Sequence, residues 1–164
     1  MKTKIETLQK ALKGKTAAEV LAYVVEAFGS KVALASSLGA EDQVLTDLLL
    51  KTDKTARIFT LDTGRLNPET YDVLDRTNLK YGVKLEVFYP DHEKLEAFVN
   101  SKGINPFYES IDNRKMCCGI RKIEPLKRAL STLDLWITGL RRDQSITREA
   151  MQLVEFDEGN NLIK

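Results

Sequence analysis

The chain has 164 residues, of which 43% are hydrophobic and 30% are charged, which is typical of one globular domain with its own core. Its 25 basic and 24 acidic residues leave a net charge of +1, which disfavours a strongly basic nucleic-acid-binding protein and an acidic disordered tail. No apolar run approaches the ~18 residues that a membrane helix needs, and the N-terminal residues MKTKIETLQK lack the apolar segment of a secretory signal. We therefore expect a cytoplasmic protein that binds neither a membrane nor a nucleic acid.

The first third of the chain predicts a helix, a strand and a second helix. A capping box of Thr16 and Glu19 begins a helix that ends at Gly29. The short apolar run of residues 31–38 predicts a buried strand, and the spacing of apolar side chains in residues 44–49 predicts the next helix.

Strands and helices continue to alternate in the middle of the chain. Residues 56–62 and 84–89 predict strands, and between them Pro68 opens a helix that runs to about Tyr81. Residues 95–103 predict a further helix.

The last third of the chain completes the pattern. Residues 117–130 are helical in character, although Pro125 should end or kink that helix. Residues 133–140 predict a fourth strand, and residues 152–156, followed by a DEGNN turn, predict the start of a hairpin. Strands separated by helix-length segments form βαβ units with both sheet faces covered. The predicted fold class is therefore α/β, doubly wound around a mainly parallel sheet.

The candidate site residues are those that follow the strands, because ligands bind beyond the carboxyl ends of the strands in an open α/β sheet. They are Ser36, Ser37, Gly39 and Asp42 after the first strand, Asp62, Thr63 and Gly64 after the second, and Gly139, Arg141 and Arg142 after the fourth. This convergence of small, hydroxylated and charged residues at one sheet edge favours a binding site.

Each group also has a plain structural interpretation. Serines, a glycine and free N–H groups at a helix start can bind an anion, but a serine-capped helix start is the better explanation of the first loop taken alone. Arg141 and Arg142 offer forked donors suited to phosphate or sulfate oxygens, or they form a surface pair satisfied by Asp143.

The only two cysteines, Cys117 and Cys118, are adjacent. Neighbouring Cα atoms lie ~3.8 Å apart, whereas a disulfide prefers about 4.4–6.8 Å, so this pair could bridge only with strain. Consecutive helical positions also point to different faces, and the residues alone leave a functional pair and two unrelated buried thiols equally open. Lys122 follows Cys118 by four residues, so it either lies beside the thiols and holds an anion or is simply solvated.

Four segments carry a family resemblance: SSLGAED, LDTGRLNPETY, CCGIRKIEPLKRAL and GLRRDQSITR, in that order, between about residues 31 and 148. Together they resemble the assimilatory adenylyl-sulfate (APS) and phosphoadenylyl-sulfate (PAPS) reductases, and the last two segments are the most specific. The resemblance implies an adenine nucleotide α-hydrolase-like fold.

The resemblance also implies roles for single residues. Ser36, Ser37, Gly39 and Asp42 would belong to a modified PP-loop around the substrate, while Leu61, Asp62, Thr63 and Gly64 would lie near the adenosine. Gly139 would bind substrate, and Arg141 and Arg142 would contact the phosphosulfate. Cys117 and Cys118 mark the iron–sulfur branch, in which they would be two thiolate ligands of a 4Fe–4S cluster, with Lys122 between the cluster and the sulfate. Adjacent thiolates that point different ways can hold two different irons.

In this family the reduction is nucleophilic. A C-terminal cysteine attacks the sulfur of the sulfate, AMP leaves, and thioredoxin reduces the resulting S-sulfocysteine and releases sulfite. The iron–sulfur branch generally prefers APS over PAPS. The implied partners are therefore one of these nucleotides and thioredoxin, and relatives are often homo-oligomers.

The chain departs from the family pattern in its cysteines. It has neither the C-x-x-C that supplies the other two cluster ligands nor the Glu-Cys-Gly-Leu-His segment that supplies the nucleophile. We therefore expect residues 1–164 to be a single nucleotide-binding reductase domain of a longer protein, without the C-terminal catalytic segment and inactive alone.

Three other functions stay open at this point. A PAPS reductase would need an extra basic pocket for the 3′-phosphate, which the sequence does not identify. A PP-loop ATP pyrophosphatase would have a Ser-Gly-Gly-x-Asp-Ser-like loop, from which residues 36–42 depart. A non-catalytic nucleotide-binding fragment is the third.

Overall fold

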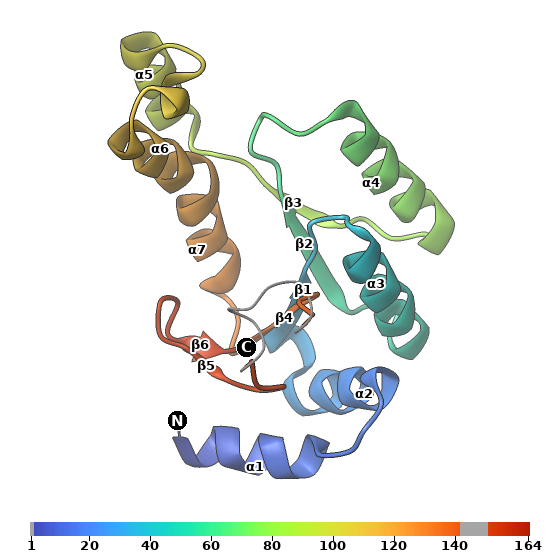
Figure 1. The fold of residues 1–164 in the computed structure, drawn as a ribbon. Helices are drawn as coiled ribbons and strands as arrows, with labels where there is room; N and C mark the ends of the chain where they lie inside the picture. Colours follow the sequence, from blue (N-terminus) through green and yellow to red (C-terminus); the bar gives the residue numbers. More distant parts are fainter. Residues whose placement is uncertain (1, 142–150) are drawn as a thin grey trace.

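The computed structural model describes residues 2–141 and 151–164, and these residues form a six-stranded sheet (Figure 1). In sheet order the strands are β3 (Glu86–Phe88), β2 (Arg57–Leu61), β1 (Val32–Ala35), β4 (Leu135–Thr138), β6 (Leu162–Ile163) and β5 (Phe156–Asp157). Every neighbouring pair is parallel except β5 and β6, which form the predicted antiparallel hairpin. The prediction of an α/β fold with a mainly parallel sheet is confirmed.

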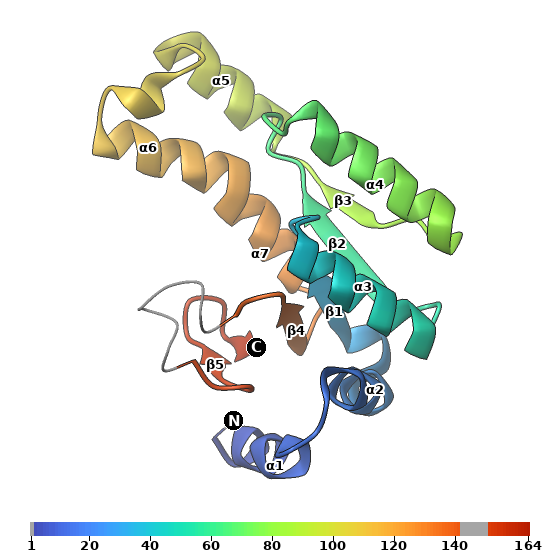
Figure 2. The ribbon, with the colours of Figure 1, turned by 45° about the vertical axis from the view of Figure 1, so that its right-hand side comes forward.

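Helices cover both faces of this sheet (Figures 1 and 2). They are α1 (Lys2–Leu12), α2 (Ala17–Phe28), α3 (Ala40–Thr52), α4 (Pro68–Tyr81), α5 (His92–Lys102), α6 (Ile111–Cys118) and α7 (Glu124–Leu130), with short helical turns at Gly29–Lys31, Pro106–Tyr108 and Gly119–Ile123. Helices α2, α3 and α4 lie on one face and α7 lies on the other, while α5 and α6 extend beyond the sheet as an arm. None of the helices in the described ranges is long and apolar enough to cross a membrane.

Alternation along the central strands explains the two covered faces. Leu34 and Ile58 pack with the leucines of α3, whereas their neighbours Ala33 and Phe59 pack with Ala129 and Leu130 of α7. Successive strand residues point to opposite faces, so a strand that is apolar throughout needs a helix on each side.

Helix α1 was not predicted. Its large apolar residues are only Ile5, Leu8 and Leu12, and most of the other side chains are polar or charged. Leu8 and Leu12 are nevertheless buried in a cluster that also contains Val154 and Ile163. The helix is therefore buried partly by residues from the other end of the chain, which a local pattern does not reveal.

The predicted interruption of the helix at Pro125 takes the form of a π turn. The N–H of Glu124 donates to the carbonyl of Gly119, five residues back, and α7 continues directly after it. Proline has no N–H to give to the preceding turn and its ring crowds that turn. A wider π turn immediately before the proline removes the conflict, and such turns often occur at functional sites.

The cap of α2 is the local feature most open to a stability test. Thr16 accepts a hydrogen bond from the N–H of Glu19, whose carboxylate accepts from the N–H and hydroxyl of Thr16 at 2.8 and 2.7 Å. We expect Thr16→Ala to lower the free energy of unfolding by about 1 kcal/mol, because it removes the hydroxyl that accepts the N–H of Glu19. Chemical denaturation measures this change.

Thr3→Ala is the matched control, since Thr3 is exposed and its hydroxyl takes part in no cap. It should change the unfolding free energy by no more than about 0.5 kcal/mol. Equal losses in both variants would contradict the capping role.

Candidate functional site

The carboxyl ends of β1, β2 and β4 lie side by side at one edge of the sheet. Ala35, the last residue of β1, is in register with Phe59 of β2 and with Thr138 of β4. The loops that follow these strands therefore start from adjacent positions. We call them the β1 loop (residues 36–39), the β2 loop (residues 62–65) and the β4 loop (residues 139–141).

A buried carboxylate organises the β1 loop. Asp42, in the first turn of α3, is 6% exposed, and its Oδ2 accepts both the backbone N–H and the hydroxyl of Ser37 at 2.6 Å each. Both donors of Ser37 are used inside the loop, so Ser37 has neither of them left for an anion. Asp42 thus shapes the loop.

The rest of the β1 loop is held in an unusual conformation. Leu38 has a φ of 64°, its N–H donates to Ser36 Oγ at 3.0 Å, and its side chain is buried. A non-glycine residue in this left-handed region costs about 1–3 kcal/mol and is found most often at functional sites. Gly39 then provides no side-chain cap for α3, which leaves the first N–H groups of the helix as an anion-binding position.

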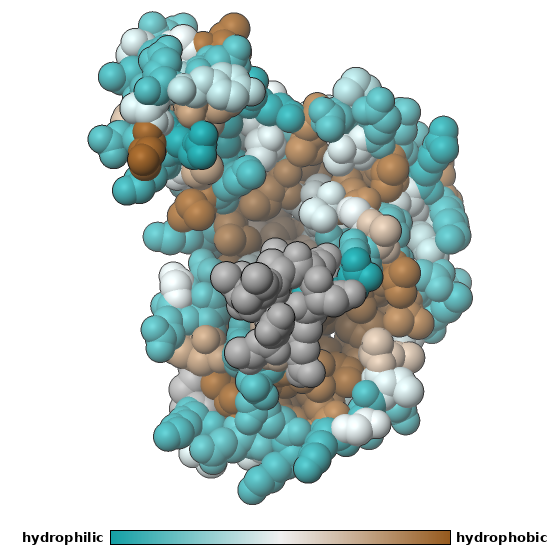
Figure 3. Space-filling view, in the orientation of Figure 1, coloured by the Kyte–Doolittle hydropathy of each residue, from teal (hydrophilic) through white to brown (hydrophobic). Residues whose placement is uncertain are grey.

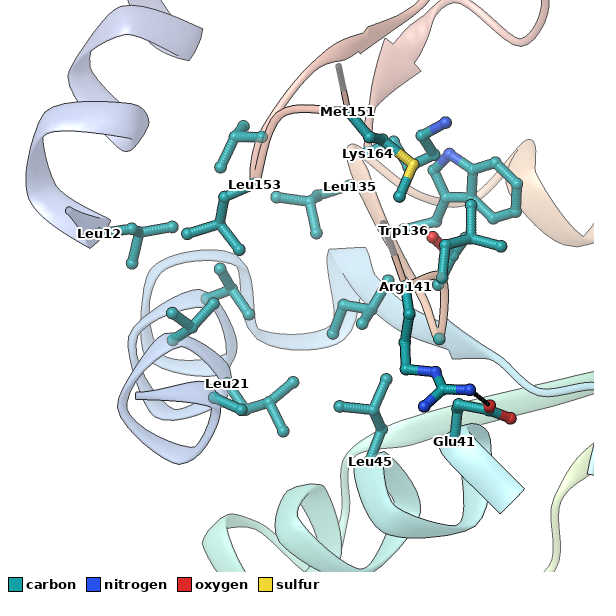
Figure 4. Close-up of a pocket in the computed structure, with 18 of the residues that line it drawn as sticks. Leu12, Leu21, Glu41, Leu45, Leu135, Trp136, Arg141, Met151, Leu153 and Lys164 are labelled. Carbon is teal, nitrogen blue, oxygen red and sulfur yellow. Dashed lines mark ion pairs between the residues drawn. The ribbon is translucent and has the colours of Figure 1, made fainter. Parts of the chain in front are cut away.

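The β4 loop packs directly against the same turn of α3. A Cβ atom at Gly139 would lie 2.0 Å from Asp42 Oδ1 and 3.3 Å from the Asp42 backbone nitrogen, so no other residue fits without displacing the carboxylate. Two residues later, Arg141 pairs with Glu41 across a distance of 3.0 Å (Figure 4). Arg142, predicted beside it, lies outside the described residues.

A cavity of about 720 Å³ opens on one side of the Glu41–Arg141 pair (Figure 4). Its walls are mainly apolar and include Leu21 of α2, Leu45 of α3 and Leu135 of β4. Of the predicted site residues that the structure describes, only those of the β4 loop line it.

The β2 loop lies on the other side, toward the arm. Asp62 is buried, and its Oδ1 accepts the N–H of Gly64 at 2.7 Å and the hydroxyl of Tyr71 at 3.1 Å. The hydrogen bond to Asp62 raises the pKa of the Tyr71 hydroxyl above its ordinary value. Gly64 has a φ of 69°, a conformation that favours glycine. Leu61, which ends β2, packs in the core under α7.

Two arginines attach the β2 loop to the arm. Arg65 donates to the carbonyl of Ile104 and to Asn105 Oδ1, and it lies over the Phe107 ring. Arg121, in the π turn after α6, donates from Nη1 to the carbonyl of Thr63 at 2.6 Å. Hydrophobic side chains line the hollow between the arm and helices α3 and α4 (Figure 3).

Arg121 is the site residue that sequence reasoning missed. It is 7% exposed, whereas the neighbouring Lys122, which was predicted, is exposed and makes no hydrogen bond or ion pair within the described chain. One signal could have found it, because Arg121 follows Cys117 by four residues and so shares its helix face.

The two cysteines lie at the end of α6 as free thiols, Cys117 buried and Cys118 half-buried. Among the residues in the described ranges, no group of three or more His, Cys, Asp or Glu side chains could hold a metal ion. The pair alone therefore supplies two of the four thiolates that a 4Fe–4S cluster needs.

The structure gathers the predicted residues into two groups. Ser36, Ser37, Gly39, Asp42, Gly139 and Arg141 surround the first turn of α3. Thr63 and Gly64 instead contact Arg121 in the helical segment that holds Cys117, Cys118 and Lys122. The first group could bind an anion, and the second places thiols on a helix attached to the β2 loop.

The contact between Gly139 and Asp42 makes a mutational prediction. Gly139→Ala should displace the Asp42 carboxylate, weaken its bonds to Ser37 and lower the unfolding free energy by about 1–3 kcal/mol through overpacking. Chemical denaturation measures the loss. Gly119→Ala is the control, because Gly119 has a helical φ of −56° and a Cβ there meets nothing within 4 Å. The contact would be unimportant if Gly139→Ala were as stable as this control.

Known proteins resemble this chain over most of its length. An adenosine 5′-phosphosulfate reductase from Burkholderia cepacia is 46% identical over 134 residues, which cover 82% of this chain and 54% of the relative. Another from Pseudomonas aeruginosa (strain LESB58) is 43% identical, over 93% of this chain and 57% of the relative. The chain thus spans about half the length of these relatives.

Solved structures show the same fold. The phosphate complex of a PAPS reductase from Candida auris superimposes with a TM-score of 0.80 at 26% identity, covering 98% of this chain and 75% of that one. An NH3-dependent NAD synthetase from Campylobacter jejuni, at 12% identity and a TM-score of 0.53, shares the fold alone, over 85% of this chain and 58% of that one. This is the adenine nucleotide α-hydrolase fold.

The family model of the phosphoadenosine phosphosulfate reductase domain matches residues 31–164. That range begins just before β1 and includes all three loops, so the chain belongs to the phosphoadenosine phosphosulfate reductase family.

Proposed function

We propose that this chain is the nucleotide-binding part of a thioredoxin-dependent adenylyl-sulfate reductase, which converts APS to sulfite and AMP in the cytoplasm during sulfate assimilation. One observation carries the proposal. The adjacent thiols Cys117 and Cys118 lie on a helical segment that Arg121 fastens to the β2 loop. A nucleotide beside that loop would therefore lie close to the thiols.

The loops divide the binding of the substrate between them. The uncapped N-terminus of α3, after Gly39, offers N–H groups and a helix dipole to the phosphate oxygens. Arg141 and Arg142 contact the phosphosulfate, and the β2 loop lies near the adenosine. Asp42 and Gly139 act indirectly, since the carboxylate is committed to Ser37 and the glycine gives it room.

The reaction is a displacement at sulfur. A cysteine thiolate attacks the sulfate sulfur, the bond from that sulfur to the phosphate oxygen breaks, and AMP leaves with the electron pair. A thioredoxin dithiol then reduces the enzyme S-sulfocysteine, which releases sulfite and forms the thioredoxin disulfide. The residues of this chain hold the nucleotide and balance its charge. In this proposal the attacking thiolate is not one of this chain's two cysteines, which would have another role.

That other role is ligation of a 4Fe–4S cluster. Cys117 and Cys118 would hold two of its irons, and Lys122 on the next turn would stand between the cluster and the sulfate. Such a cluster supplies thiolate-bound iron whose potential depends on nearby charge and hydrogen bonds to sulfur. The other two ligands would come from outside residues 1–164, which in this proposal form one nucleotide-binding domain.

Reduction of PAPS is the second candidate, favoured by the structural similarity to the Candida auris enzyme. The named APS reductases are more similar in sequence, at 43–46% identity against 26%. A 3′-phosphate would also need a further basic pocket, and Arg65, the basic residue of the β2 loop, already binds Ile104 and Asn105.

Nucleotide binding to the 164-residue chain tests this assignment. We expect isothermal titration calorimetry to show tighter binding of APS than of PAPS or ATP. Arg141→Gln should weaken APS binding about tenfold, the usual effect of losing one charge-assisted hydrogen bond. It should weaken AMP binding less, because AMP lacks the sulfate.

Arg76→Gln is the control for that variant, since Arg76 is an exposed arginine of α4. The Arg76→Gln protein should bind APS and AMP with wild-type affinity. Preferential binding of PAPS would select the second candidate. Hydrolysis of ATP to AMP and pyrophosphate would instead indicate a PP-loop ATP pyrophosphatase.

A second prediction concerns turnover. The 164-residue chain has only two cysteines, so we expect no sulfite release from APS in the presence of reduced thioredoxin. A colorimetric sulfite assay under anaerobic conditions measures this. Any thioredoxin-dependent sulfite release from this chain would contradict the prediction, because it would require one of the two adjacent thiols to act as the nucleophile.

A further inference from the structure

Arg121 is a buried cation with an incomplete set of partners. Its side chain is 7% exposed, its Nη1 donates to the carbonyl of Thr63, and its Nε is buried without a hydrogen-bond partner. Within the described residues no carboxylate forms an ion pair with it. A buried guanidinium normally has a counter-charge, because taking a charge out of water is costly.

The surroundings of Arg121 are shaped to receive it. Gly64, next to Thr63, has no side chain, and a Cβ there would lie 3.3 Å from Arg121 Nη1. The Oδ1 of Asp62 accepts the N–H of Gly64 at 2.7 Å. The β2 loop is thus fixed between the carboxylate of its first residue and a guanidinium from the helix.

A merely structural role does not account for this arrangement. An apolar side chain of similar length would fill the same space without burying a charge, and such replacements of buried ions are often neutral or stabilising. Arg121 instead connects the β2 loop to the turn that directly follows the cysteines. The charge of Arg121 would be balanced by an anion bound nearby, which in the proposed function is either the nucleotide or the cluster at Cys117 and Cys118.

We propose that Arg121 is a positioning residue that holds the β2 loop against the helix of Cys117 and Cys118 and whose uncompensated charge strengthens the binding of an anionic nucleotide. The inference rests on the proposed function for the identity of the nucleotide. The hold on the loop itself is independent of that function.

The test compares Arg121→Met, which keeps the length of the side chain without its donors, with Arg121→Lys, which keeps a charge and one donor group. Arg76→Met, on the exposed face of α4, is the matched control. In the folded proteins we expect Arg121→Met to weaken APS binding about tenfold or more, Arg121→Lys to weaken it less, and Arg76→Met to have no effect. Adenosine, which has no charge, should lose less affinity than APS in Arg121→Met.

Hydrogen exchange of the ligand-free chain separates this inference from the proposed function. Arg121→Met should speed exchange at the Gly64 amide and leave the amide of Val24 in α2 unchanged, whether or not any nucleotide binds. If the wild-type chain binds no adenine nucleotide, the proposed function fails. Whether Arg121 holds the β2 loop is then judged from the exchange rate of the Gly64 amide alone.

Wild-type APS affinity together with wild-type exchange at Gly64 in folded Arg121→Met would overturn the inference. If Arg121→Met does not fold, Arg121→Lys decides by the same two measurements. Equal losses of affinity for APS and adenosine would overturn the role of the charge.

Discussion

The site depends on the carboxylate of Asp42. One of its oxygens accepts two hydrogen bonds from Ser37, and the other occupies the space that a side chain at Gly139 would need. These contacts join the β1 loop, the start of α3 and the β4 loop. They also explain how a leucine can remain at a φ of 64° next to Ser37, since a strained conformation persists only where its surroundings determine it.

The second connection runs through arginine side chains. The β2 loop touches the π turn through Arg121 and the Pro106–Tyr108 turn through Arg65. Both turns belong to the arm, which otherwise extends away from the sheet (Figure 2). Together with the packing of α7 on the sheet, these contacts fix the position of the thiols relative to the strand ends. A reaction between a bound nucleotide and groups near those thiols requires such a position.

Sequence patterns predicted much of this fold, because the central strands are buried on both faces and some helices begin at clear signals, such as Thr16 before α2 and Pro68 in α4. The alternation of Ala33 and Leu34 between two helix layers follows directly from the spacing. Helix α1 was missed because its burial depends on Val154 and Ile163 at the other end of the chain. Strand ends were also predicted too long, since β1 stops at Ala35, where the bonds of Asp42 and Ser36 turn the chain out of the sheet.

The sequence predicted which residues belong to the site better than it predicted which of them contact one another. Motif resemblance selected Ser37, Asp42 and Gly139 together as substrate-binding residues, but only coordinates show that they bind one another. Arg121 was missed because the neighbouring Lys122 is the more obvious anion partner in a sequence. Both residues lie in the π turn before Pro125, where Arg121 is the buried one, and that turn has no clear local signature.

The charged side chains at this edge of the sheet are of two kinds: some keep their hydrogen-bond partners within the protein, and others can change partner when a ligand binds. Asp42 and Asp62 are buried and hydrogen-bonded within their own loops, so breaking their bonds would leave unpaired polar groups at a large cost. The pair of Arg141 and Glu41 is different, since their side chains are 58% and 32% exposed, and an exposed pair is worth only about 0–1 kcal/mol. An anionic ligand can therefore recruit Arg141 from Glu41 with little loss, while the carboxylates that shape the loops stay in place. The same division would allow acidic residues to surround the proposed site for a negatively charged nucleotide. Asp42 and Asp62 direct their oxygens at N–H and hydroxyl donors of the protein, and the N-terminus of α3 and the arginines are left to meet the ligand.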